Sequence, residues 1–244
     1  MKKILEPKLL PFLACGAGGA ALVLQGLMML LCRDEKGLLP HPNWLHLLAW
    51  CLVILALALT AAAVRPLKGH NRYAENFPAS LPGAVGSFAL ALGIAICVIF
   101  FPEDTGDIPA MLWRVTGLAS VPCLIFTGYC RMKGKRPAFY FHGMVFVFFV
   151  LHLVNRCRDW GSDPELAEYT FALFACVGLM LTAYYRAAFD CGIGRRRMQL
   201  LCALLCCCTC LAAVPGQQQF LLYLTGAVWA VTNLCDRNPG GQEC

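Results

Sequence analysis

Eight apolar stretches separated by short polar segments constrain this chain more than any other feature of its sequence. They lie at residues 9–32, 44–64, 81–101, 108–129, 138–155, 165–189, 200–214 and 220–234. Most of them approach the roughly 17–25 residues that a helix needs to cross a hydrocarbon core about 30 Å thick. Turn-forming residues between the stretches, such as Pro102 and the pair Pro215-Gly216, favour breaks between helices. The pattern predicts an all-α fold, a polytopic integral membrane bundle of about eight transmembrane helices that forms one domain over residues 1–244.

The composition excludes most soluble classes of protein. Hydrophobic residues make up 59% of the 244 residues, charged residues 14%, and the mean hydropathy is +0.64. A soluble domain averages about 45–50% apolar and about 25% charged residues. The net charge of +6 comes from Lys and Arg in short segments between apolar stretches, which is typical of topology selection in a membrane. We therefore expect the lipid bilayer as a partner and exclude nucleic acid.

The distribution of Lys and Arg predicts how the chain is threaded through the membrane. Fifteen of these residues are assigned to one side: they lie before the first apolar stretch, after the last one, in the second, fourth and sixth connecting segments, or, in the case of Arg186, at the inner end of the 165–189 stretch. Four lie in the remaining segments, and Arg114 lies inside the 108–129 stretch. Because short cytoplasmic loops carry an excess of Lys and Arg, this split places both the N-terminus and the C-terminus in the cytoplasm. The protein is then expected in the cell membrane.

The 16 cysteines predict neither a disulfide framework nor a metal site. Most of them lie inside apolar stretches, where cysteine behaves as a small hydrophobic residue. Cys207 and Cys210 have a C-x-x-C spacing, but no histidine or carboxylate lies near them in the sequence. No two histidines have the i, i+4 spacing of a helical metal pair. We expect no metal and no cofactor.

Ionisable residues near the outer boundary form a candidate ligand-binding site. Arg114 and Glu168 both lie near the outer ends of their predicted helices, and charges within a membrane are usually paired or line a cavity. His152 and Arg156 have the i, i+4 spacing that places two residues on one helix face. These four residues are predicted to line an outward vestibule. The structural alternative, in which Arg114 extends its side chain to the interface or only pairs with Glu168, stays open.

The inner end of the 165–189 stretch carries a second charged group. Asp190 follows that stretch, and a carboxylate at a helix C-terminus opposes the helix dipole and needs a positive partner. Arg186 lies one turn earlier and Arg195–Arg197 follow closely. We predict a structural ionic clamp between Arg186 and Asp190 that ties the connecting segment to the helix end.

Two functions are compatible with these patterns. The first is a transporter-like or permease-like protein that moves a small molecule of unknown identity. The alternative is a non-catalytic partner, scaffold or sensor subunit that binds another membrane protein. The chain contains no G-x-S-x-G, H-E-x-x-H or Walker-type motif, so no enzyme is predicted.

One segment resembles a known group of sequences. Residues 164–197 read PELAEYTFALFACVGLMLTAYYRAAFDCGIGRRR, and ENFPAS occurs at Glu75–Ser80. This sequence pattern resembles that of a family of uncharacterised multi-pass membrane proteins of Gram-positive gut bacteria. The resemblance implies a bacterial inner membrane, and because that family has no known activity it implies no catalytic role.

Overall fold

The computed structural model describes residues 9–32, 43–65, 73–101, 108–160 and 169–235, and the regular structure in these ranges is helical throughout. The helices are α1 (Leu10–Leu31), α2 (Trp44–Val64), α3 (Tyr73–Asn76), α4 (Leu81–Phe100), α5 (Ile108–Met132), α6 (Phe139–Trp160), α7 (Thr170–Asp190), α8 (Arg196–Ala213) and α9 (Phe220–Cys235). Seven of them are long and apolar enough to cross a bilayer, whereas α9, with 16 residues, is shorter. The all-helical, apolar architecture agrees with the predicted membrane bundle.

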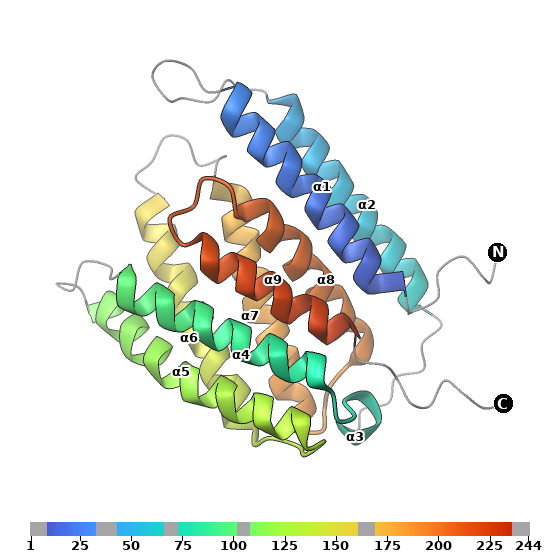
Figure 1. Cartoon of the computed structure of the whole chain (residues 1–244), viewed down its shortest axis with the longest axis vertical. Coiled ribbons are helices and arrows are strands. Elements are labelled where there is room, and N and C mark those ends of the chain that lie inside the picture. Colours follow the sequence, from blue (N-terminus) through green and yellow to red (C-terminus); the bar gives the residue numbers. More distant parts are fainter. Residues whose placement is uncertain (1–8, 33–42, 66–72, 102–107, 161–168, 236–244) are drawn as a thin grey trace.

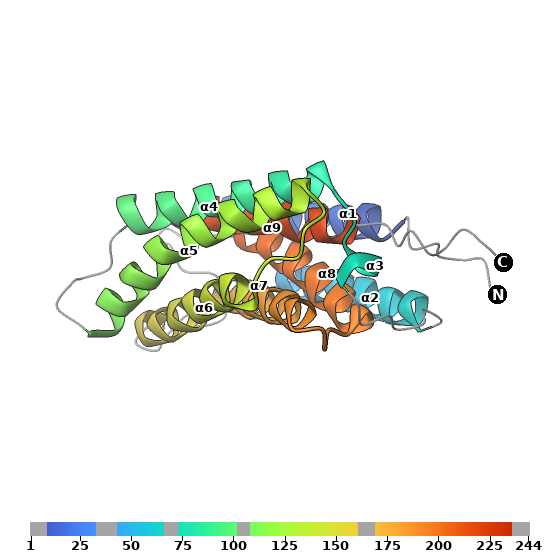
Figure 2. The ribbon, with the colours of Figure 1, turned by 90° about the horizontal axis from the view of Figure 1, so that it is seen from below.

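Helices α4 to α9 form a ring, because each contacts the next along the chain and α9 contacts α4. The hairpin of α1 and α2 packs outside this ring, mainly against α8 (Figure 1). Successive long helices run in alternating directions, so α1 begins and α9 ends on the side of the molecule that carries α3 (Figures 1 and 2). We call this side the α3 end.

Helix α8 is the centre of the bundle. Of its apolar segment, 72% of the residues are buried, compared with at most 56% in the other six candidate spans. Small thiols make this close packing possible: Cys206, Cys207 and Cys208 are all fully buried. Trp113 and Trp229, the largest of the fully buried side chains, fill space inside the ring.

The outer surface of the bundle is apolar. Leu30 on α1 is 82% exposed, Ile54 on α2 is 59% exposed and Leu92 on α4 is 60% exposed. Soluble proteins rarely expose large contiguous apolar patches, whereas a bilayer solvates such side chains without cost. This surface is consistent with an integral membrane protein.

Helix bounds differ from the sequence prediction mainly where polar residues continue a helix past its apolar stretch. Helix α8 begins at Arg196 rather than at residue 200, α5 continues to Met132, and α6 continues to Trp160. Apolar length alone underestimates α5 and α8, because Arg131 and Arg196 are buried polar residues inside them. The predicted start of the sixth stretch, at 165–168, lies outside the described residues.

Candidate functional site

A buried contact between a carboxylate and an imidazole joins α6 and α7 at the α3 end. The Oδ2 atom of Asp190, the last residue of α7, lies 2.5 Å from Nδ1 of His142 in the first turn of α6. The two residues are only 3% and 1% exposed. Arg136 donates a hydrogen bond from Nη2 to the backbone carbonyl of Asp190. Gly192, with a φ of 82°, then takes the left-handed conformation that reverses the chain toward α8.

Three arginines from three helices surround one aromatic ring next to this pair. Phe77 follows α3, and the guanidinium carbon of Arg186 lies 3.9 Å from the centre of its ring. The guanidinium carbons of Arg131 and Arg196 lie 5.1 Å and 5.2 Å from the same centre. All three arginines are at most 5% exposed. A ring face attracts cations, so Phe77 draws α5, α7 and α8 together through their basic residues.

Arg186 differs from the other two arginines in its hydrogen bonds. Arg131 donates to the carbonyl of Pro78 at 3.3 Å, and Arg196 donates to Oε1 of Gln199 at 2.7 Å. By contrast, Nε and Nη1 of Arg186 are buried and hydrogen-bond to nothing in the described part of the chain. Buried charged donors without a partner are costly, so these two nitrogens mark a place where a ligand would be stabilised.

Further buried polar atoms of the same region have no hydrogen-bond partner among the described residues. They are Oη of Tyr73, Oδ1 of Asp190 and Nε2 of Gln199. Native proteins contain few such atoms, and each usually reflects a bound water, ion or function. We call the side chains of Tyr73, Phe77, Arg131, His142, Arg186, Asp190, Arg196 and Gln199 the arginine cluster.

The outer residues predicted to bind a ligand are dispersed over α5 and α6. His152 is fully buried, and its Nδ1 accepts a hydrogen bond of 3.0 Å from Nε1 of Trp113. Its ring also stacks on Phe148, with centroids 5.9 Å apart. The side chain of Arg114, next to Trp113, is exposed. The structure thus brings Trp113, and not its charged neighbour, to His152.

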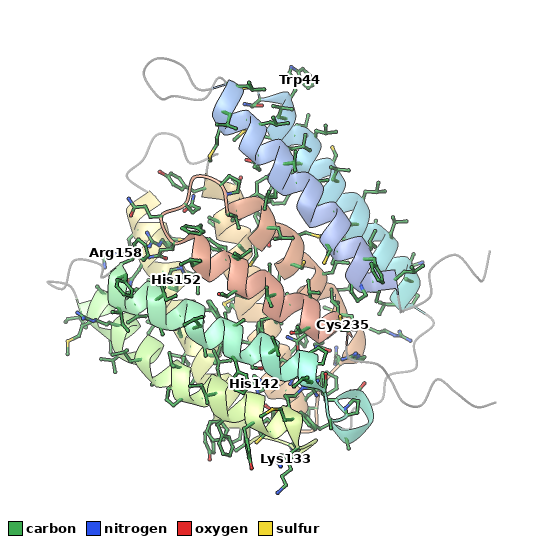
Figure 3. The ribbon with its side chains drawn as sticks, viewed as in Figure 1. Trp44, Lys133, His142, His152, Arg158 and Cys235 are labelled. Atoms are coloured by element: carbon green, nitrogen blue, oxygen red, sulfur yellow. The ribbon has the colours of Figure 1, made fainter. Side chains whose placement is uncertain are left out.

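The structure describes fewer contacts for the other two predicted outer residues, Arg156 and Glu168. Arg156 is half-buried on α6, one turn beyond His152, and makes an interaction of its own. Glu168 lies outside the described residues, and its predicted pairing with Arg114 therefore stays a prediction. Figure 3 shows His152 away from the α3 end and His142 nearer to it, so the outer candidates and the arginine cluster are separate regions of the bundle.

For the predicted clamp, the structure shows a different partner for the carboxylate. Asp190 pairs with His142 through Oδ2, while the guanidinium of Arg186 lies on the ring of Phe77. The need of the Asp190 carboxylate for a positive partner at the end of α7 predicted charged side chains at this end of the bundle. Sequence reasoning missed His142 and Phe77 because both are distant from Asp190 along the chain. Within the described residues there is no group of three or more His, Cys, Asp or Glu side chains placed to hold a metal ion.

Comparison with protein-family models, with curated proteins and with solved structures finds no match to this chain.

Proposed function

We propose that the protein is an integral membrane protein of the bacterial inner membrane that binds a small anionic solute at the arginine cluster and acts as a permease for it. The observation that carries this proposal is Arg186, a buried cation inside a candidate membrane span, two of whose nitrogens hydrogen-bond to no described residue. Ionisable residues within spans are expensive, and they commonly mark substrate pathways. Arginine also suits oxyanions, because its planar group presents several donors at once.

The proposed orientation places the arginine cluster at the cytoplasmic side. The excess of Lys and Arg in alternate connecting segments puts both termini in the cytoplasm. Since α1 begins and α9 ends at the α3 end (Figure 1), that end is then the cytoplasmic one. A solute released from the cluster would enter the cytoplasm, and the outer region around His152 would face the outside.

Anion binding is tested by the thermal unfolding midpoint of the purified chain in phosphatidylcholine nanodiscs. Sodium acetate and sodium phosphate should raise the midpoint of the wild type above its value in sodium chloride of equal ionic strength. Arg186→Gln should abolish the rise. Arg195→Gln should retain it, because Arg195 is exposed at the same end and its side chain makes no capping hydrogen bond. Equal responses of the two variants, or no response of the wild type, would contradict the proposal.

Permease action is tested separately with proteoliposomes. The anion that raises the midpoint most should accumulate by counterflow in vesicles containing the wild type and not in vesicles containing Arg186→Gln. If the anion binds but shows no counterflow, the proposed anion site stands and the proposed transport function is wrong.

A second candidate function is that of a non-catalytic membrane partner, scaffold or sensor subunit. One observation favours it: an added side-chain carbon at Gly16, Gly19 or Gly26 of α1 would meet open space. Small residues allow helices of two chains to approach closely in lipid. If this face binds another membrane protein, Gly19→Leu should shift the protein from a larger complex to a smaller one in size-exclusion chromatography, and Arg186→Gln should not.

A further inference from the structure

The arginine cluster offers a buried acceptor as well as buried donors. Oδ2 of Asp190 is held by His142, but Oδ1 is buried and hydrogen-bonds to nothing described. Arg186 and Asp190 are four residues apart, so they lie on one face of α7 with about 5–6 Å between their Cβ atoms. A simple anion would satisfy Arg186, but its oxygens would be repelled by the neighbouring carboxylate. The occupant therefore needs a donor beside its negative charge.

Helix α8 supplies one more oriented donor. Oε1 of Gln199 accepts a hydrogen bond from Arg196, and this fixes the amide so that Nε2 remains a donor with no partner in the described part of the chain. Gln199 is fully buried and Arg186 is 2% exposed, so neither group has bulk water as an alternative. Donors on α7 and α8 thus accompany the charged acceptor on α7. This arrangement matches a molecule with an oxyanion at one end and an N–H cation at the other.

We infer that the ligand of the arginine cluster is a small zwitterion, with its oxyanion on Arg186 and Gln199 and its ammonium group donating to Oδ1 of Asp190. This inference rests on the proposed anion site and adds the chemical class of the ligand. Two sources carry this chemistry: a free α-amino acid, and the headgroup of phosphatidylethanolamine, which joins a phosphate to a primary ammonium. The oxyanion of the ligand would pair with Arg186 and its ammonium group with Asp190, so each of these two buried charges would gain an opposite partner.

The test compares matched probes on the full-length protein in phosphatidylcholine nanodiscs. Choline has a quaternary nitrogen without an N–H, so this lipid offers no ammonium donor. Glycine is compared with acetate and L-alanine with propionate, because each pair shares the carboxylate and differs in the ammonium group. The amino acids should bind about tenfold or more tightly than the simple carboxylates, as expected for one satisfied charged hydrogen bond. In a parallel arm, phosphatidylethanolamine replaces part of the phosphatidylcholine, and a rise in the unfolding midpoint identifies the lipid as the source.

Two variants test whether Asp190 causes the preference for glycine over acetate. Asp190→Asn should bind glycine and acetate equally and should lose any response to phosphatidylethanolamine. His142→Gln also removes the contact between the imidazole and Asp190 but keeps the carboxylate, so it should retain the preference for glycine even if the protein is less stable. If the wild type binds glycine and acetate equally and phosphatidylethanolamine has no effect, the inferred zwitterionic ligand is wrong, whereas the proposed anion site still stands. No response to glycine, acetate, phosphate or phosphatidylethanolamine would overturn both.

Discussion

The pair formed by His142 and Asp190 should couple α6 to α7 energetically. Nδ1 of His142 and Oδ2 of Asp190 lie 2.5 Å apart, and both side chains are buried, so neither atom has bulk water as an alternative partner. Removing one partner leaves the other polar group buried, which typically costs about 3–5 kcal/mol. His142→Gln and Asp190→Asn should therefore each lower the free energy of unfolding by about 3 kcal/mol. The double variant should lose little more than either single variant, which gives a coupling energy of about 2–3 kcal/mol.

This double-mutant cycle is measured by unfolding the protein with sodium dodecyl sulfate in mixed micelles and following the fluorescence of its five tryptophans. His152→Gln is the matched control, because His152 lies on the same helix about 15 Å further along. When His152→Gln is combined with Asp190→Asn, the losses in the free energy of unfolding should add. If the losses of the His142 and Asp190 variants also add within about 0.5 kcal/mol, the two side chains do not form a pair in the folded protein.

Two further predictions concern the packing of the bundle, and both use the same unfolding titration. Gly178→Val should lower the free energy of unfolding by about 1–3 kcal/mol, because an added Cβ would lie 2.8 Å from Cα of Cys206 on α8. Gly143→Val, where the added atom meets open space, should cause no such loss, and equal effects would contradict the α7–α8 contact. Trp113→Phe should cost about 1–3 kcal/mol, because it removes the donor to the fully buried His152. An unchanged stability would show that this hydrogen bond is not formed.

The helical architecture could be predicted from the sequence because bilayer thickness and hydropathy are strong, local constraints. The stretch at 44–64 has the same bounds as α2, and the stretch at 81–101 exceeds α4 by one residue. The ends of α5 and α8 were harder to predict. There, buried arginines continue the helix, and their burial depends on Phe77, which is remote along the chain.

The candidate site could be predicted only in part for a related reason. A carboxylate at a helix C-terminus opposes the helix dipole, so the sequence of one helix is enough to predict that Asp190 needs a partner. Its partner His142 comes from a different helix, and no periodicity connects the two residues. Likewise, the charge of Arg114 inside an apolar stretch predicts a role in a site. The rotation of the helix about its own axis, however, decides which side chain faces the interior of the bundle. On α5 that side chain belongs to Trp113.

We expect Nε and Nη1 of Arg186 to be hydrogen-bonded by a ligand and not by the protein. An experimental density map of the chain in nanodiscs, with glycine present, tests it most directly. We predict a non-protein feature larger than one water molecule, within hydrogen-bond distance of Nε or Nη1 of Arg186 and near Oδ1 of Asp190, that is lost in Arg186→Gln. A map in which those nitrogens are bonded to a carboxylate of the protein, or in which side chains fill the space beside them, would contradict the claim.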